Sequence, residues 1–595
     1  MPARHCPPPA TPIAPAADPQ HALALDRFHF VSVNPTSERQ KSHNRSVIRS
    51  HASRYIWRQH RARRTPNPAA KPPAARLQPS SPPAPPPRPP STTTNPTASS
   101  SSSSPPPQPL PSPPSPSTDN DRDDYDAASQ LVPQAAAAAA ADRPFNLLTA
   151  WLADPSHAAP SMLGESAISK LMQYAVLDLW PGLVLGAANR RWHRKDAAQN
   201  WLPPAMSSPA LFTAFLYGAA GHMQTRKRLE SAHVAPQTRD EKLEQIVCET
   251  ETIKQLNKMM HHPSQACSDE VILAVLCMAF NRIDYSGWNV ADPWPKAPLR
   301  NLQWLDVYGG LSLNDHHIKG LLALIETKGG LDQLKMPGLA EILSTAVVML
   351  STKCLVKPRL PFVPIFAESA QGKTPHWPTL TNPVLFGTPL DSRPVDPVLN
   401  AGLPEDIVSV LQQMRDYNHV VNVYSQGLLP QLELAVIADR RNWIQYNLVA
   451  LSSVWELPEQ FMQIYETYET CRLAAQIYSM LVIFPLPAAN RPFKRLASMV
   501  RAAFLESEHS MAWNSGKEML LWCLVLGTMA AKNTSDRSWF CRKLASALDA
   551  VGPGSWQELK GHLASVMWMD SVCDIGGREA WLEATTTSSI HDDSE

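Results

Sequence analysis

The spacing of apolar residues after about Phe145 constrains the fold more than any other feature of this sequence. Apolar side chains recur there at intervals of three and four residues over long windows, and alternating β-branched runs between hairpin turns are missing. This spacing predicts amphipathic α-helices, because residues three and four apart lie on one face of a helix. We therefore expect an all-α fold of about a dozen helices, arranged as one body or as two subdomains.

Helix ends can be predicted at several positions. Gly329 and Gly330 can take the positive φ of a helix C-cap, and they follow an apolar stripe of Ile318, Leu321, Leu322 and Ile325. A second helix should begin after Pro337 and present Leu339, Ile342, Leu343, Ala346 and Leu350. Ser555 and Glu558 predict a reciprocal capping box ahead of a helix that turns inward Leu559, Leu563 and Val566. Further helices are expected over 209–228, 239–260, 269–281, 405–428, 458–480, 492–504, 516–531 and 538–550.

The segment before the helical region has a different composition. Residues 65–120 contain 21 of the 59 prolines, interleaved with serine runs and almost no aliphatic residues. Such a segment cannot bury enough apolar area to offset backbone ordering, which costs about 1–2 kcal/mol per residue. We expect a disordered Pro/Ser/Ala-rich linker over 65–142, so that the N-terminal quarter to third of the chain is disordered apart from one basic motif.

That basic motif lies at 28–64, and its charge is concentrated in 39–64, which holds nine Arg and Lys residues and no Asp or Glu. Since the whole chain carries +1 and this segment carries +9, the rest carries −8 and has no global attraction for a polyanion. We interpret the motif as a short extended element followed by an Arg-rich helix that serves as a nuclear-import signal. Non-specific phosphate or partner contact, specific DNA reading and a merely solvated basic helix remain as alternatives. The candidate residues are Arg45, Arg49, Arg54, Arg58, Arg61, Arg63 and Arg64.

Cysteine and histidine usage favours no metal site and no membrane segment. The nine cysteines form no C-x-x-C pair, and several lie in apolar helical runs, which is typical of reduced, structural thiols. His261 with His262, and His316 with His317, are adjacent, so they cannot chelate one ion well from a helix, and we expect surface or capping roles. The longest apolar run, 519–531, is shorter than the roughly 20 residues that span a bilayer, and no secretory leader is recognised.

Enzymatic motifs are missing as well. The sequence contains no nucleophile elbow, phosphate loop, H-E-x-x-H or dinucleotide fingerprint. Asp570, Cys573 and Asp574 near Arg578 predict an ion pair at a helix end, beside a turn in "GGREAW", in preference to a catalytic thiol. Four tryptophans are expected as core anchors and not as a ligand cage, namely Trp539, Trp556, Trp568 and Trp581. We expect no enzyme, no cofactor and no metal.

Several of these helices, in their order along the chain, resemble the fungal-specific transcription factor-like domain. The resemblance runs from about Pro209 to Glu583, with a gap over the proline-rich stretch. It is carried by "SPALFTAFLYGAAGHM", by the helix, Gly-Gly break and helix in "HHIKGLLALIETKGGLDQLKMPGLAEIL", by "YETCRLAAQIYSMLVIFPLP", and by a C-terminal block from "LLWCLVLGTMAA" to "SWQELKGHLASVMWMDSVCDIGGREAWLE". The resemblance implies a large all-α regulatory domain.

The N-terminal motif "FHFVSVNPTSERQKSHNRSVIRSHASRYIWRQHRARR" is similar to the start of a subgroup of that family that lacks the zinc cluster. The cluster requires six cysteines in C-x2-C-x6-C type spacing, whereas this chain has only Cys6 before Cys248. The family's sequence-reading module therefore cannot be transferred. DNA binding, if it occurs, is expected to be weak or indirect.

These features together predict a nuclear transcription-regulatory protein. Its expected segments are a disordered start at 1–27, the basic motif at 28–64, the linker at 65–142 and an all-α domain at 143–595. Within that domain we expect a proline-rich ordered connection at 357–398 and a disordered tail at 586–595. The helical domain should bind an effector or transcription-related protein partners, and the basic motif a nuclear import receptor. The alternatives are an interaction scaffold that never touches DNA and, less favoured, an enzyme with a cavity between helices.

Overall fold

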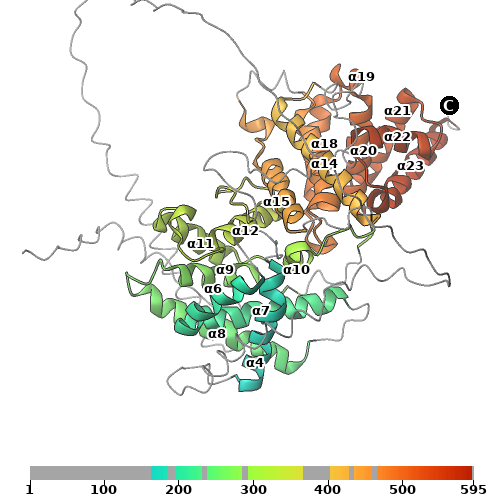
Figure 1. Ribbon diagram of the computed structural model, residues 1–595. Helices are drawn as coiled ribbons and strands as arrows, with labels where there is room; N and C mark the ends of the chain where they lie inside the picture. Colours follow the sequence, from blue (N-terminus) through green and yellow to red (C-terminus); the bar gives the residue numbers. More distant parts are fainter. Residues whose placement is uncertain are drawn as a thin grey trace, which may run out of the picture. The chain divides into compact units, whose positions relative to one another are not determined.

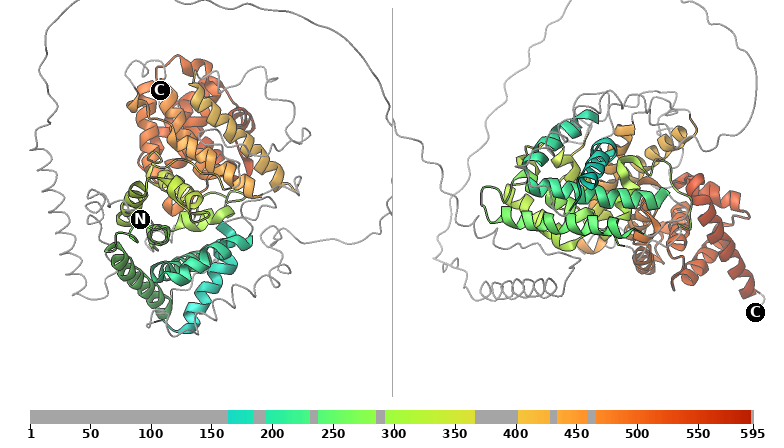
Figure 2. Two further views of the ribbon diagram at one scale, coloured as in Figure 1. Left: turned by 60° about the vertical axis from the view of Figure 1, so that its left-hand side comes forward. Right: turned by 90° about the horizontal axis from the view of Figure 1, so that it is seen from below.

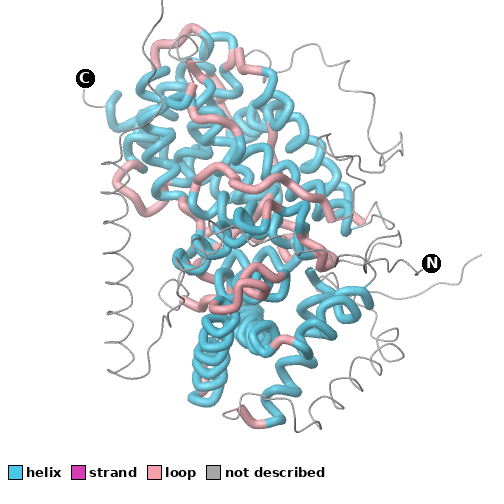
Figure 3. The backbone as a smooth tube through the Cα atoms, turned by 90° about the vertical axis from the view of Figure 1, so that its left-hand side faces the viewer, coloured by secondary structure: helices cyan, strands magenta, loops and turns pink. Residues whose placement is uncertain are grey.

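The computed structural model describes residues 163–183, 194–230, 237–284, 292–365, 402–427, 434–457 and 466–592. Helices dominate these segments, and no strand forms within them (Figure 3). The β-type pairing that does occur in this part of the chain is an isolated bridge between Arg282 and Ser312. The predicted all-α fold class is confirmed.

The amino-terminal helices pack around α7, which contacts α4, α6, α8, α9 and α10 (Figures 1 and 2). The first turns of α7 are apolar on every side, and a helix of that composition is stable only when surrounded. We call the surrounding cluster, which runs from Leu163 to Leu343, the amino-terminal core. The elements are α4 (Glu165–Tyr174), the π-helical turn η3 (Ala175–Leu179), α5 (Trp180–Leu183), α6 (Arg194–Ser207), α7 (Pro209–Glu230), α8 (Arg239–Met260), α9 (Asp269–Phe280), the 3₁₀ turn η4 (Leu302–Trp304), α10 (Leu305–Gly310), α11 (Asp315–Lys328), the 3₁₀ turn η5 (Leu331–Gln333) and α12 (Leu339–Cys354).

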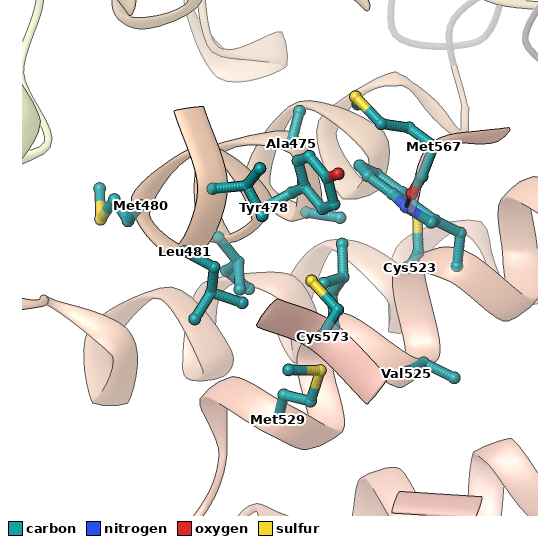
Figure 4. Packing of buried hydrophobic residues seen from close by; sticks show 14 of the residues in the cluster. Ala475, Tyr478, Met480, Leu481, Cys523, Val525, Met529, Met567 and Cys573 are labelled. Carbon is teal, nitrogen blue, oxygen red and sulfur yellow. Dashed lines mark hydrogen bonds between the residues drawn. The ribbon is translucent and has the colours of Figure 1, made fainter. Parts of the chain in front are cut away.

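The later helices pack around α20, which is apolar on every side and contacts α17, α18, α21, α22 and α23. Figure 4 shows part of the resulting cluster, in which Tyr478, Cys523, Met529 and Cys573 lie close together. We call this cluster, which runs from Trp294 to Ala584, the carboxyl-terminal core. The elements are α14 (Glu405–Ser425), α15 (Leu434–Ala450), the 3₁₀ turn η7 (Val454–Glu456), α17 (Tyr468–Tyr478), the π-helical turn η8 (Ser479–Ile483), the 3₁₀ turn η9 (Ala488–Asn490), α18 (Phe493–Ser507), α19 (Ala512–Ser515), α20 (Lys517–Ala530), α21 (Arg537–Val551), α22 (Trp556–Val566) and α23 (Asp570–Asp592).

Helix α12 connects the two clusters, because it contacts α9 on one side and α15 on the other. Its start is fixed by Asp269, the first residue of α9, whose Oδ2 accepts the backbone N–H groups of Lys335 (2.6 Å) and Met336 (2.7 Å). Gly329 and Gly330 have φ of +99° and +102° and end α11 as predicted. The two glycines therefore end α11 and turn the chain toward the start of α12.

The first residues of the proline-rich connection lie against α12 and α15. The backbone N–H of Val363 donates to Ser344 Oγ (2.8 Å), and that of Ile365 donates to Asp439 Oδ1 (3.0 Å). Phe362 packs edge-on against Trp443 at 5.2 Å between ring centroids. Residues 362–365 thus pack onto the helical body, and residues 366–398 of the predicted connection lie outside the described segments. The basic motif and the linker also lie outside them.

Three local predictions are corrected by the structure. Ser555 Oγ accepts the N–H of Glu558, but the Glu558 carboxylate accepts from Gly554 (2.7 Å), so the predicted capping box is only half formed. "GGREAW" is not a turn, because α23 continues through Gly576 and Gly577 to Asp592, beyond the start of the tail expected at 586. A Cβ at Gly577 would lie 2.6 Å from the Trp568 ring, so these glycines allow close packing instead of a turn.

Candidate effector cavity

An apolar cavity of about 110 Å³ lies where the two cores meet. Trp180, Phe215 and Leu273 of the amino-terminal core form part of its wall, and Leu305, Met349 and Phe484 of the carboxyl-terminal core form another part. Helix α12 contributes Ile342, Thr345 and Ala346. The cavity is therefore a product of how α12 holds the two clusters together, and neither cluster encloses it alone.

A buried cation lies in this apolar wall. Arg441 of α15 lines the cavity, and only 1% of its surface is exposed. Its guanidinium donates to the carbonyl oxygen of Leu302 (3.0 Å), to Gln303 Oε1 (3.0 Å) and to Asn442 Oδ1 (3.0 and 3.1 Å), and lies 5.4 Å from the Phe484 ring centroid. All three acceptors are neutral. In the described segments no carboxylate oxygen lies within 4.0 Å of this guanidinium, and burial lowers the pKa of Arg441 to about 10 although Tyr417, Asp306 and Asp439 act against it.

The side-chain amide of Gln303 lies at one edge of the cavity, and hydrogen bonds fix its orientation. Its Oε1 accepts hydrogen bonds from both Arg441 Nη2 and Asn442 Nδ2 (2.8 Å). These two bonds identify the atom facing Arg441 and Asn442 as the oxygen, so the amide nitrogen points away from them. That Nε2 is buried without a hydrogen-bond partner in the described residues, and so is Oδ1 of Asn281, which also lines the cavity. Unsatisfied buried polar atoms of this kind cost about 1–3 kcal/mol each and are rare.

The backbone at this edge is strained. Gln303 and Trp304 both have φ of 55°, a left-handed conformation that side chains other than glycine rarely adopt. Trp304 is held there by a hydrogen bond from its Nε1 to the Leu179 carbonyl oxygen (2.9 Å) and by the Arg226 guanidinium 4.9 Å from its ring centroid. Gly182 leaves the room for this indole, since a Cβ at that position would lie 2.1 Å from Nε1. Such strain costs about 1–3 kcal/mol per residue and is concentrated at functional sites.

Two π-helical turns border the same cavity. Leu179 is the last residue of η3, Phe484 follows η8 directly, and both line the cavity. A π-turn inserts one residue into a helix, so it shifts the side chains that follow onto a different face. Because π-turns are rare and often lie at functional sites, their occurrence on both sides of one cavity marks this region as specialised.

A buried histidine lies beside the cavity. His222 of α7 is fully buried, its Nδ1 lies 2.8 Å from the Tyr174 hydroxyl, and its ring contacts Trp304 at 4.8 Å and the cavity residue Tyr308 at 5.4 Å. Burial, together with the nearby charge of Arg226, lowers the pKa of His222 to about 3. A neutral imidazole packed among aromatic rings supports the wall and is not poised for acid-base chemistry at neutral pH.

The other candidate residues from the sequence lie away from this cavity. His261 and His262 are exposed beyond the end of α8, as expected. His317 is buried in α11, which lowers its pKa to about 4, so of the surface or capping roles predicted for it the surface role is excluded. Asp570 and Asp574 pair with Lys560 (2.6 and 2.8 Å) and not with Arg578. The seven arginines of the basic motif lie outside the described segments.

Cysteines and tryptophans take structural roles. The eight cysteines of the described segments are free thiols, and burial raises the pKa of Cys573 well above its ordinary value, which removes its nucleophilic form. Trp568 is buried, and Trp539, Trp556 and Trp581 pack against the carboxyl-terminal core, as expected of core anchors. No cluster of His, Cys, Asp or Glu in the described segments could hold a metal ion. None of the helices there combines the length and the apolar character of a membrane span.

Sequence patterns did not single out Gln303, Arg441 or Asn281 as site residues. The available signal was an Arg pair in the apolar stretch "LAVIADRRNWIQYNLVA", where a helix was not predicted but α15 forms. Charged residues in a helix usually face water, and only the packing of η4 onto α15 shows that Arg441 is buried.

Comparison with known proteins agrees with the resemblance seen in the sequence. The sequence model of the fungal-specific transcription factor domain matches residues 189–558, which is 370 of the 595 residues. The matched range contains Gln303, Arg441 and α12, and it stops short of Leu179 and Trp180 on the other wall of the cavity. No curated protein and no solved structure matches the chain. Because the match covers more than half of the chain, the chain belongs to the fungal-specific transcription factor domain family.

Proposed function

We propose that this protein regulates transcription in the nucleus and that its helical domain responds to a small effector bound in the cavity between the two cores. Membership of the family supports transcription regulation. The observation that supports an effector is the cavity itself, whose wall carries a buried cation, unsatisfied polar atoms and strained backbone. A purely structural interior has no use for this combination, because each of these features lowers stability.

The cavity suits an effector because α12 contacts both cores. A ligand that contacts α12 and η4 together would favour one arrangement of the two clusters over others, and an effector can shift an equilibrium only through such differential contacts. The change would be passed to partner proteins on the outer faces of the domain. No chemical step is needed for this role.

A reporter assay tests the effector role. The full chain is tethered to a promoter through a heterologous DNA-binding module, and reporter output is compared between the wild type and Ala346→Phe, which fills the cavity from α12. Ala502→Phe on the exposed side of α18 is the matched control. We expect Ala346→Phe to move output toward that of the module alone while Ala502→Phe does not. Output unchanged by Ala346→Phe, at equal protein abundance, would contradict the effector role.

The basic motif is proposed to direct the chain to the nucleus through an import receptor. Its support is the charge of 39–64, since nine cations without one acid fit an acidic receptor groove and the rest of the chain carries −8. Replacing Arg58, Arg61, Arg63 and Arg64 by Gln should abolish nuclear accumulation. Replacing four exposed lysines of the helical domain, Lys242, Lys258, Lys319 and Lys517, is the matched control and should leave localisation unchanged. Nuclear accumulation of both variants would discard the assignment.

Direct DNA contact is proposed to be weak and confined to the same motif. A short basic arm binds phosphate without reading bases, so its affinity should fall steeply between low and physiological salt. A gel shift that is sequence-dependent and survives competitor DNA would contradict this, and loss of all binding above about 150 mM salt would agree with it. A scaffold that never touches DNA remains the alternative, favoured by the absence of zinc-cluster cysteines in the sequence.

A further inference from the structure

The wall of the cavity contains a cation without an anion. Arg441 donates hydrogen bonds to a carbonyl oxygen and to two side-chain amide oxygens, all of which are neutral. The carboxylates that act on its charge, Asp306 and Asp439, do so only at a distance. Asp439 Oδ1 is itself engaged by the backbone N–H of Ile365. A buried cation is costly unless it is paired, so a position beside Arg441 favours an anionic group that enters from the cavity.

Two residues that line this cavity have unused donors. A guanidinium has five N–H groups, and the four hydrogen bonds of Arg441 leave one of the two on Nη1. Gln303 adds the two N–H groups of its partnerless Nε2, and only 5% of this residue is exposed. A carboxylate has two oxygens that accept from such a pair of donors, and charge-assisted bonds of this kind are the strong ones. Asn281 Oδ1, 4% exposed and also without a partner, can accept from a hydroxyl on the ligand.

The size and lining of the cavity limit the rest of the ligand. A cavity of roughly 150 Å³ in an apolar interior admits benzene, and the about 110 Å³ here is smaller, so the apolar part of a ligand is limited to a short branched chain. Trp180, Phe215, Leu276 and Ile342 would surround that apolar part. Sugars, nucleotides and long lipids are excluded by size or by polarity.

We infer that the cavity binds a small monocarboxylate, whose carboxylate is held by Arg441 Nη1 and Gln303 Nε2 and whose apolar part fills the space between the two cores. This inference rests on the proposed function, because it names the chemical class of the effector. The strained backbone at Gln303 and Trp304 fits this role, since it presents the Gln303 amide at the cavity edge before any ligand arrives.

Calorimetric titration of the full chain tests the inference with matched probe pairs. Isobutyrate is compared with isobutyramide, and isovalerate with isovaleramide, so that each pair keeps the same apolar part and replaces a charged carboxylate by a neutral amide. We expect each carboxylate to bind at least about tenfold more tightly than its amide, the effect of one charge-assisted hydrogen bond. Equal affinity within both pairs, or no binding by either carboxylate, would overturn the inference.

Gln303→Glu separates ligand binding from stability. The new carboxylate keeps an acceptor for Arg441, so the fold should be retained, but it removes the Nε2 donors and repels an incoming anion. We expect isovalerate affinity to fall at least about tenfold, while thermal unfolding shows no loss of stability. Gln265→Glu, the same change at an exposed residue beyond α8, is the matched control and should bind as the wild type. Unchanged isovalerate affinity in Gln303→Glu would also overturn the inference.

The inference and the proposed function fail in different ways. If Ala346→Phe alters the reporter but no carboxylate binds, the effector role stands and the carboxylate class is wrong. If carboxylates bind as expected but neither they nor Ala346→Phe alter the reporter, the site is real and the regulatory role is wrong.

Discussion

Two buried arginines in this protein differ in the charge of their hydrogen-bond partners. Arg472 of α17, 7% exposed, forms a two-pronged pair with Glu469 (2.6 and 3.0 Å), which also accepts from Ser453 and from the backbone of Val454. Arg441, 1% exposed, has only carbonyl and amide acceptors. The first site is complete and holds η7 against α17. The second is incomplete and borders a cavity, and this difference separates a structural cation from one available to a ligand.

The largest expected effect comes from breaking the complete pair. Arg472→Met leaves Glu469 charged, buried and without its cation, which should lower the free energy of unfolding by about 3–5 kcal/mol. Chemical denaturation measures this. The double variant Arg472→Met/Glu469→Leu removes both charges and should recover much of the loss. A single variant as stable as the wild type would show that the pair contributes nothing.

Acid should weaken the cavity side of the molecule. The pKa of His222 is lowered to about 3 from an ordinary value of about 6.5, so the unfolded chain binds a proton that the folded chain rejects. The contribution of neutral His222 to the free energy of unfolding is fully present above pH 6.5 and is lost as pH falls toward 3. By pH 5 this loss should reach about 2 kcal/mol.

The partners that face His222 are Tyr174, Arg226, Trp304 and Tyr308, and none of these titrates between pH 5 and 7. Thermal unfolding at several pH values should therefore show a shallower slope over that range for His222→Phe than for the wild type. His317 has the same sign and remains in both proteins, so it does not affect the comparison. Identical slopes would place the acid sensitivity elsewhere.

Removing the incomplete cation should cost less than removing the complete one. Arg441→Met strips hydrogen bonds from Leu302 and Asn442 but leaves no carboxylate in direct contact unpaired, so we expect a loss of about 1–2 kcal/mol in the free energy of unfolding. The same chemical denaturation as for Arg472→Met provides the measurement. A loss as large as that of Arg472→Met would mean that the two sites are equivalent after all.

The smallest effect, and the only gain, should come from completing the incomplete site. Gln303→Glu gives Arg441 the carboxylate that Arg472 already has, and the exchange of a neutral for a charge-assisted hydrogen bond should raise the free energy of unfolding by about 1 kcal/mol. A clear loss of stability in this variant would show that Asp306 and Asp439 already balance Arg441.

Helices that depend on local signals were predicted well. α8 begins at Arg239 behind Thr238 and ends at Met260, as expected, because the capping box of Thr238 and Glu241 is encoded within four residues. α15 was not predicted, since its apolar residues surround "ADRRN" without a clean stripe, and its burial depends on η4 and α12. The Gly576–Gly577 pair was misread because a glycine that permits close packing and one that permits a turn look alike in sequence.

The sequence by itself determined the all-α class, the position of most helices, the family and the charge imbalance between the basic motif and the rest of the chain. These properties follow from the periodicity, capping and composition of neighbouring residues. Only the tertiary structure decided that Arg441, Gln303 and Asn281 meet at one apolar cavity. They lie in α15, in η4 and directly after α9, so their burial and unmet hydrogen bonds arise only when α12 and η4 bring the two cores together.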